Sequence, residues 1–126
     1  MQVVAGDGLG NSICGFNTAN TNANYTGMEA GVFLVPNGTN PFVWYVENGT
    51  PGYAGTFVSV GDYIGVFRVG STLTIRKSTT KPTTLSSWTT IYTFGTFTSS
   101  AALYMNINQS NSGSNKLYYP QCLNCQ

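Results

Sequence analysis

The stretch "GDYIGVFRVGSTLTIRKS" (residues 61–78) places apolar side chains at every second position on both sides of a Gly-Ser pair. A period of two is the side-chain period of a β-strand, so this pattern predicts two strands joined by a tight turn. Gly70-Ser71 suits a two-residue type II′ turn, because glycine takes positive φ at the first central position without steric cost. The turn sets the register of the hairpin, with the expected pairs Val69–Thr72, Arg68–Leu73, Phe67–Thr74, Val66–Ile75 and Gly65–Arg76.

This register sorts the side chains of the hairpin onto two faces, because cross-strand partners point to the same side of a sheet. One face is aliphatic and is expected to face the core: Ile64, Val66, Leu73 and Ile75, with Arg68 and Lys77 at its rims. The opposite face is aromatic and polar: Tyr63, Gly65, Phe67, Thr74 and Arg76. Such a face suits contact with solvent or with a ligand.

The period of two continues along most of the chain, and no helix-length window has apolar residues at helical spacing. The sequence therefore predicts an all-β sandwich or barrel of short strands. The expected strands are 12–16, 28–35, 42–47, 55–60, 62–69, 72–77, 88–94, 102–108 and 116–119. Segments 28–35 and 41–47 are apolar on both faces, as expected of central strands in stacked sheets. A bulge in 88–94 is expected to bring Trp88, Ile91 and Phe94 to the core side.

The composition points to a surface setting. The chain has 126 residues, which suits one domain over 1–126, with terminal segments at 1–11 and 120–126. Charged residues make up only 7% of it, against about 25% in typical soluble domains. Ser, Thr, Asn and Gly must cover the surface instead, and a neutral polar coat is typical of extracellular or virion-surface β-proteins. We expect the protein to work in one of these two places.

The charges and the hydropathy argue against two kinds of partner. The net charge is +1 and three cations cluster at 76–81, whereas binding nucleic acid needs several phosphate-neutralising cations on one surface. No apolar run approaches the roughly 20 residues that span a membrane. We therefore expect no nucleic-acid binding and no membrane insertion. No signal peptide is visible, which suits both a virion protein and a domain cut from a larger surface protein.

Three cysteines, Cys14, Cys122 and Cys125, bear on metal and redox chemistry, because "CLNC" has the spacing of both kinds of site. Zinc normally takes four ligands and the chain has no histidine, while a redox CxxC lies at the start of a helix. We expect a terminal clip in which Cys14 pairs with one of the other two, or three reduced thiols. Asp7 and Asn11 in "GDGLGN" are too few side chains for calcium, so no metal or cofactor is expected.

Four stretches follow one another along the chain: "EAGVFLVPNGTNPFVWYVENGT", "GDYIGVFRVGSTLTIRKST", "SWTTIYTF" and "AALYMNINQSNSGSNKLYY". In this order they resemble the concanavalin A-like, or laminin-G-like, jelly-roll modules of bacterial surface proteins, carbohydrate-active enzymes and phage fibres. The resemblance covers about residues 28–119 and is a fold-level pattern without an active-site motif. It implies an antiparallel two-sheet jelly-roll β-sandwich, in a superfamily where many members bind glycans or host surfaces and others are spacers.

The acidic residues do not suggest an enzyme. Glycosidases need two carboxyl groups about 5–10 Å apart. The four acids here are scattered along the chain, and Asp62 suits a turn in which it bonds its own backbone. Without histidine, Ser-His and Cys-His nucleophile pairs cannot form. We expect a non-catalytic protein.

The aromatic and amide content favours carbohydrate, or another cell-surface ligand, as the partner. Sugars present an apolar C–H face and many hydroxyls, and the chain offers eight Tyr, seven Phe and two Trp beside abundant Asn and Thr. The candidate ligand-binding residues are Tyr63, Phe67, Thr74 and Arg76, joined by Tyr104 and Asn106 if the two sheets align. The alternative is that Phe67 packs under a loop or a neighbouring subunit. A separate alternative for the function is a fibre, stalk or capsid-decoration domain that acts by self-assembly.

Overall fold

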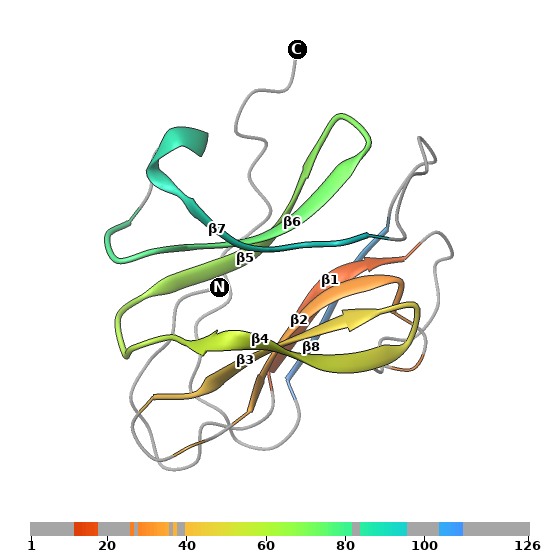
Figure 1. Ribbon diagram of the computed structural model, residues 1–126, viewed down its shortest axis with the longest axis horizontal. Helices are drawn as coiled ribbons and strands as arrows, with labels where there is room; N and C mark the ends of the chain where they lie inside the picture. The colour runs from red at the N-terminus through yellow and green to blue at the C-terminus, as the bar shows by residue number, and fades with distance from the viewer. Residues whose placement is uncertain are drawn as a thin grey trace.

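Two antiparallel β-sheets lie one above the other (Figure 1). The computed structural model describes residues 12–17, 26, 28–35, 37, 40–81, 84–95 and 104–109. One sheet has five strands in the order β4-β3-β2-β1-β8, and the other has three in the order β5-β6-β7. The strands are β1 (Ser12–Asn17), β2 (Ala30–Val35), β3 (Phe42–Glu47), β4 (Thr50–Phe57), β5 (Tyr63–Val69), β6 (Thr72–Ser78), β7 (Thr89–Thr93) and β8 (Tyr104–Gln109). A 3₁₀ turn, η2 (Leu85–Ser87), precedes β7, and none of the described residues forms a helix that could cross a membrane.

The β5–β6 hairpin has the predicted register. All the expected pairs, from Val69–Thr72 to Gly65–Arg76, are present. Gly70 has a φ of 60°, whereas Ser71 does not take positive φ, as a type II′ turn requires. Local sequence signals were sufficient here, because the glycine turn and both alternating strands specify the same pairing.

The core lies between the two sheets and takes side chains from both. Its buried members are Ala30, Val32, Leu34 and Val43 from the five-stranded sheet, Ile64, Leu73 and Ile75 from the three-stranded sheet, and Val58 and Phe94 from flanking segments. Val66 packs against this cluster and is partly buried. The predicted core face of the β5–β6 hairpin is therefore confirmed. So is the all-β class with two sheets packed face to face.

Strand β4 differs from its prediction. It covers residues 50–57 rather than 55–60, and Pro51-Gly52, a dipeptide typical of turns, lies inside the strand. The turn that joins β3 to β4 is Asn48-Gly49, with φ values of 48° and 73°. Because β4 is an edge strand, one of its sides has no neighbouring strand. A proline whose backbone nitrogen points to that side costs no hydrogen bond in the sheet. The prediction failed because strand position in the sheet, which sequence alone does not give, decides whether proline is tolerated.

The bulge expected near β7 is present, but Trp88 lies on the opposite side from its prediction. The register between β6 and β7 shifts at Ile75/Arg76, which leaves Ile91 as the extra residue. Ile91 and Phe94 pack against the core as expected. The Trp88 ring instead contacts the outward-facing Phe67, with 4.6 Å between ring centroids. The bulge lies after Trp88 in the chain. It therefore changes which side of the sheet the later residues point to, but not the side to which Trp88 points.

Asp62 holds the turn that leads into β5. Its Oδ2 accepts a hydrogen bond from the Ser59 N–H (2.9 Å), and its own N–H donates to the Ser59 carbonyl oxygen (3.0 Å). Asp62→Ala is expected to lower the free energy of unfolding by about 1 kcal/mol, because one partly buried N–H loses its acceptor. Urea denaturation measures this loss. Asp62→Asn retains an acceptor and should lose less, and equal losses for the two variants would contradict this role.

Candidate binding face

The residues predicted to bind ligand lie on two different sheets. Four of them share the outer face of the three-stranded sheet: Tyr63, Phe67, Thr74 and Arg76. Tyr104 and Asn106 lie on β8, at the edge of the five-stranded sheet. The structure therefore places these two residues on a different sheet from the other four, and their part in one site stays a prediction. Alternation predicts the two faces of a strand but not the sheet to which the strand belongs.

On the three-stranded sheet, Phe67 is already in contact with other side chains. Its ring packs against Trp88, and the guanidinium carbon of Arg76 lies 5.8 Å from its centroid. Arg76 Nε donates to Thr74 Oγ1 (2.9 Å), and Thr74 is buried. These contacts match the alternative in which Phe67 packs under a connecting segment, here the one that carries Trp88 after η2.

A larger group of aromatic side chains lies on the outer face of the five-stranded sheet. Two cross-strand pairs join β3 to β4 there, Phe42–Phe57 and Trp44–Tyr53. They face away from the core because Val43, which lies between them on β3, is buried in the core. The Tyr53 ring contacts Phe42 edge-on (5.5 Å between centroids) and Trp44 (6.1 Å). We call Phe42, Trp44, Tyr53 and Phe57 the aromatic face.

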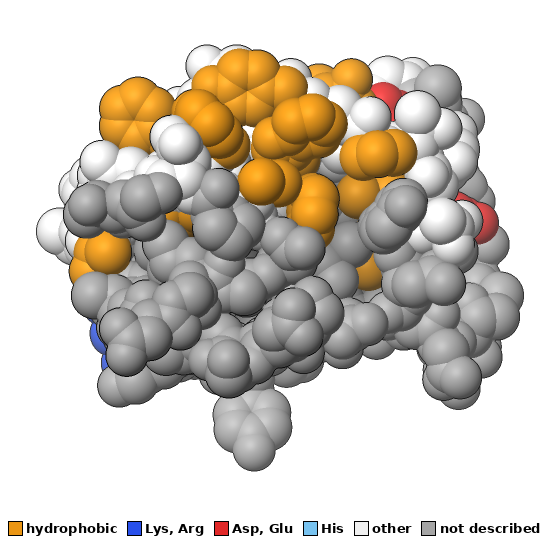
Figure 2. Space-filling view, turned by 90° about the horizontal axis from the view of Figure 1, so that it is seen from below, with side chains coloured by type: hydrophobic (Ala, Val, Ile, Leu, Met, Phe, Trp, Pro, Cys, Tyr) orange, Lys and Arg blue, Asp and Glu red, His pale blue; other side chains and the backbone are white. Residues whose placement is uncertain are grey.

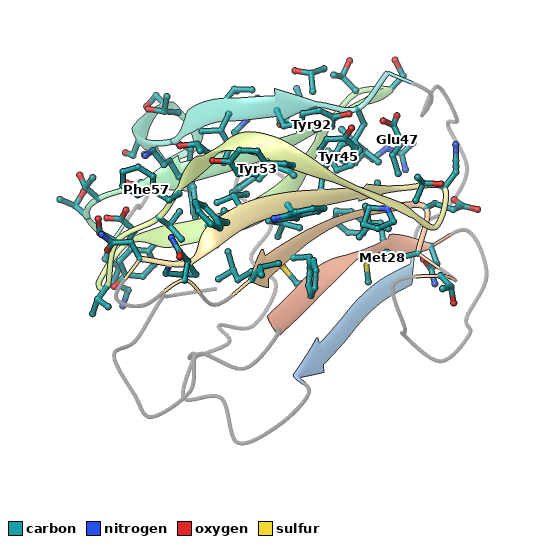
Figure 3. The ribbon with its side chains drawn as sticks, turned by 60° about the horizontal axis from the view of Figure 1, so that its bottom comes forward. Met28, Tyr45, Glu47, Tyr53, Phe57 and Tyr92 are labelled. Atoms are coloured by element: carbon teal, nitrogen blue, oxygen red, sulfur yellow. The ribbon has the colours of Figure 1, made fainter. Side chains whose placement is uncertain are left out.

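The aromatic face is open to solvent along β4. Tyr53 is 48% exposed and Phe57 is 52% exposed, although large apolar side chains are normally buried. Figure 2 shows hydrophobic side chains gathered on this side of the molecule with acidic side chains at the edge of the group, and Figure 3 shows Tyr53 and Phe57 along the same strand. Contiguous exposed apolar surface rimmed by polar groups is typical of interaction sites.

A register shift between β3 and β4 gathers these rings. Val43 pairs with Thr56 but Trp44 pairs with Tyr53, so β4 uses two extra residues over this step. Gly55, one of the two, has a φ of 77°, which favours glycine. Tyr53 and Phe57 are four positions apart on β4, but their partners Trp44 and Phe42 are only two positions apart on β3. The irregular strand concentrates aromatic surface in one place.

An open hollow of about 400 Å³ lies at one end of the aromatic face. It is lined by Phe42 and Phe57 and by two asparagines, Asn37 and Asn40. The Asn40 N–H donates to the Asn37 carbonyl oxygen (3.3 Å), so this turn holds both asparagines next to the start of β3. Neither side-chain amide has a hydrogen bond to another described residue. The hollow therefore combines two aromatic rings with two amides that can bond a ligand.

Sequence reasoning missed the aromatic face although its signal was present. The two-sided apolar pattern of 41–47 was interpreted as burial on both faces, which fits a strand covered on both sides. Two of the even positions of this segment, Phe42 and Trp44, are aromatic, but the third is Val46, and the odd positions include both Val43 and Tyr45. The following strand is rich in turn residues, which indicates a sheet edge. The available signal was therefore this edge strand beside Phe42 and Trp44, and not a strict alternation of aromatic and aliphatic side chains.

A different aromatic contact bridges the two sheets. Tyr45 of β3 and Tyr92 of β7 stack with 4.0 Å between centroids and an interplanar angle of 9°. The Tyr92 hydroxyl donates to Glu47 Oε2 (2.9 Å), and Figure 3 shows the three side chains together. Burial, and then the hydrogen bond to Glu47 and its negative charge, raise the pKa of Tyr92. This arrangement fastens β3 to β7 and needs no ligand to explain it.

The Tyr92 contact predicts a loss of stability at high pH. A tyrosine whose pKa is raised by folding keeps its proton in the native state when the unfolded chain releases it, so its stabilisation is complete below about pH 10 and falls above it. We expect the free energy of unfolding, measured with urea between about pH 8 and pH 11, to decline more steeply for the unmodified protein than for Tyr92→Phe. Parallel declines would show that Tyr92 does not carry the effect.

The described residues contain no group of three or more His, Cys, Asp or Glu side chains arranged to hold a metal ion. Cys14 is partly buried, and this burial raises the pKa of its thiol. Several residues on which the sequence predictions depend lie outside the described ranges: Asp7, Asn11, Cys122, Cys125 and the expected strand 116–119. The terminal clip and the metal predictions therefore stay predictions.

No protein-family model matches the sequence, and it matches neither a curated protein nor a solved structure. The protein is therefore classified by its fold and by the aromatic face. The chain is an all-β protein whose two antiparallel sheets enclose one main core. The five-stranded sheet carries an exposed aromatic face on its outer side.

Proposed function

We propose that this domain is a non-catalytic module that binds carbohydrate through the aromatic face. One observation carries the proposal: four aromatic side chains on an outer sheet face lead into a hollow that holds two asparagine amides. A sugar ring stacks its apolar C–H side on an aromatic ring, and its hydroxyls both donate and accept hydrogen bonds, as an amide group does. The aromatic rings suit the stacking, and the two asparagine amides suit the hydrogen bonding.

The absence of catalysis is part of the same proposal. The four rings and two amides that form the face include no carboxylate, thiol or lysine that could transfer a proton or attack a glycosidic carbon. The proposed site therefore binds and releases its ligand without changing it. A binding module of this kind suits an adhesin or a phage receptor-binding fibre at an extracellular or virion surface. The low charge, 7% of residues, supports that setting.

The concanavalin A-like jelly-roll topology remains part of the proposal. Two facing antiparallel sheets, which this topology requires, are present. The pairing of β8 with β1, which puts the first and last described strands side by side, also supports it. Tracing the chain between β7 and β8 and beyond β8 in an experimental structure would test the assignment. Consecutive described strands are neighbours in both sheets, β1 to β4 in one and β5 to β7 in the other, and only β8 returns to pair with β1. An experimental structure with no further crossover between the sheets would therefore contradict the assignment.

A structural role is the second candidate, favoured by the position of β4. This strand is the edge of its sheet and also carries the exposed Tyr53 and Phe57. An exposed edge with apolar side chains is a ready surface for pairing with a second copy of the chain. In that case the domain would act by self-assembly in a fibre or a capsid decoration. Light scattering during gel filtration distinguishes a monomer from such an assembly.

A glycan-array screen of the purified domain tests the main proposal. Bacterial expression avoids modification at Asn37, which begins an N-x-T sequon at the hollow. We expect binding to a set of related glycans and a marked loss of signal for Tyr53→Ala. The matched control is Val69→Ala, which truncates a similarly exposed apolar side chain (47%) on the other sheet. A blank array combined with self-association would overturn the proposal in favour of the structural role.

A further inference from the structure

We infer that the aromatic face binds a linear, uncharged glycan lengthwise, with one sugar held in the hollow and at least one more stacked on the rings beyond it. The inference rests on the proposed function and adds the chemical class of the ligand. It follows from three features of the site: the elongated arrangement of the rings, the absence of charge along them, and the single position of the amides.

The rings form a strip with the hollow at one end. Phe42 and Phe57 line the hollow, and the contacts from Phe42 to Tyr53 and from Tyr53 to Trp44 continue the aromatic surface away from it. The two cross-strand pairs are two residues apart on β3, which corresponds to about 7 Å along the strand. They therefore provide two successive stacking positions and not one. A linear chain of sugars can occupy both positions, whereas a single sugar can occupy only one.

The strip is neutral, and the described cations lie elsewhere. They are found on β5, on β6 and just after β6: Arg68, Arg76, Lys77 and Lys81. Among the described residues, none of those that form the aromatic face or line the hollow is charged. A carboxylate or sulfate on a glycan would lose water against these rings without gaining a cation. The site therefore favours an uncharged glycan over an acidic one.

The amides are confined to one end of the strip. Asn37 and Asn40 line the hollow, where each amide can both donate to and accept from a sugar hydroxyl. Hydrogen-bonding groups of this kind set the identity of the sugar, and stacking further along adds affinity for any sugar with a flat apolar side. The hollow and the strip should thus contribute differently: the hollow acts on ligands of every length, and the strip acts only on ligands longer than one sugar.

Isothermal titration of the full chain with oligosaccharide series tests this division. The probes are gluco-, manno- and xylo-oligosaccharides of one to about six residues, with oligogalacturonates as the acidic counterpart. We expect affinity for at least one neutral series to rise about tenfold from the monosaccharide to the trisaccharide and then to level off. Tyr53→Ala should abolish most of this rise. Asn40→Ala should weaken binding by a similar factor at every length, and Val69→Ala should change neither.

Each outcome bears on either the inference or the proposed function. Stronger binding to oligogalacturonates, a monosaccharide bound as tightly as its hexasaccharide, or no neutral series bound would overturn the inference. If the array nevertheless shows acidic or compact branched glycans bound and Tyr53→Ala removes that signal, the proposed function stands. A blank array together with no titration signal would overturn both. Circular dichroism of every variant shows that lost binding is not lost folding.

Discussion

Gly15→Ala is expected to destabilise the domain by at least about 3 kcal/mol, enough to leave a large fraction of the chain unfolded at 37 °C. Gly15 of β1 pairs with Gly31 of β2, and the buried Met28 packs over both glycines. A Cβ at position 15 would meet the Ala30 carbonyl oxygen and lie 2.6 Å from both Gly31 Cα and Met28 Sδ. Two of these three atoms belong to the backbone of a central strand, which cannot move without disturbing the sheet.

Gly65→Ala is the matched control, because Gly65 also lies within a strand. Among the described residues, a Cβ there would meet only the Phe67 ring, at 3.2 Å, and a side chain can adjust by a few tenths of an ångström. We expect this variant to change the free energy of unfolding by less than about 1 kcal/mol. Urea denaturation of the two variants under the same conditions makes the comparison. Similar losses for both would show that the close approach of β1 and β2 is not what requires glycine.

The double variant Tyr53→Ala/Phe57→Ala is expected to weaken glycan binding by about 2 kcal/mol, or roughly thirtyfold, because it removes the two most exposed rings of the aromatic face. Both side chains are about half exposed, so the free energy of unfolding should change much less than for a core truncation. Titration with the strongest-binding glycan from the array measures the affinity. Thermal unfolding measures the stability of the same sample.

Phe67→Ala is the informative control for that result. Phe67 belongs to the residues that the sequence predicted as a ligand platform, but its ring packs against Trp88 and Arg76. We therefore expect Phe67→Ala to lower stability while leaving glycan affinity within about twofold of the unmodified protein. If Phe67→Ala removed binding and the double variant did not, the site would lie on the three-stranded sheet, where the sequence placed it.

The parts of the fold that could be predicted are those specified by neighbouring residues. The β5–β6 hairpin is the clearest example, because Gly70 determines the turn and the alternation on both sides agrees with it. The turn at Asp62 is similar, since Asp62 and Ser59 bond within four residues. In both cases the physical cause acts over a short stretch of chain, so the sequence contains all of it.

The parts that could not be predicted depend on which distant strands become neighbours. Tyr104 and Asn106 alternate as expected of a strand, but pairing with β1 puts them on the sheet that does not carry Phe67. Trp88 lies on the outer side because the register shift with β6 comes after it. Tyr53 and Phe57 are exposed because none of the described segments covers the outer side of β4. Each of these outcomes is set by which segments of the chain pair or pack together in the folded protein.

Locating the bound ligand tests the central claim most directly, and the two tryptophans of the chain make this simple. Trp44 belongs to the aromatic face, and Trp88 packs on the outer side of the other sheet. A proton–nitrogen correlation spectrum of the protein contains one indole signal for each, and Trp88→Phe assigns them. During titration with a bound oligosaccharide, we predict that the Trp44 indole signal shifts and the Trp88 signal stays in place. A shift of the Trp88 signal with Trp44 unmoved would contradict the site.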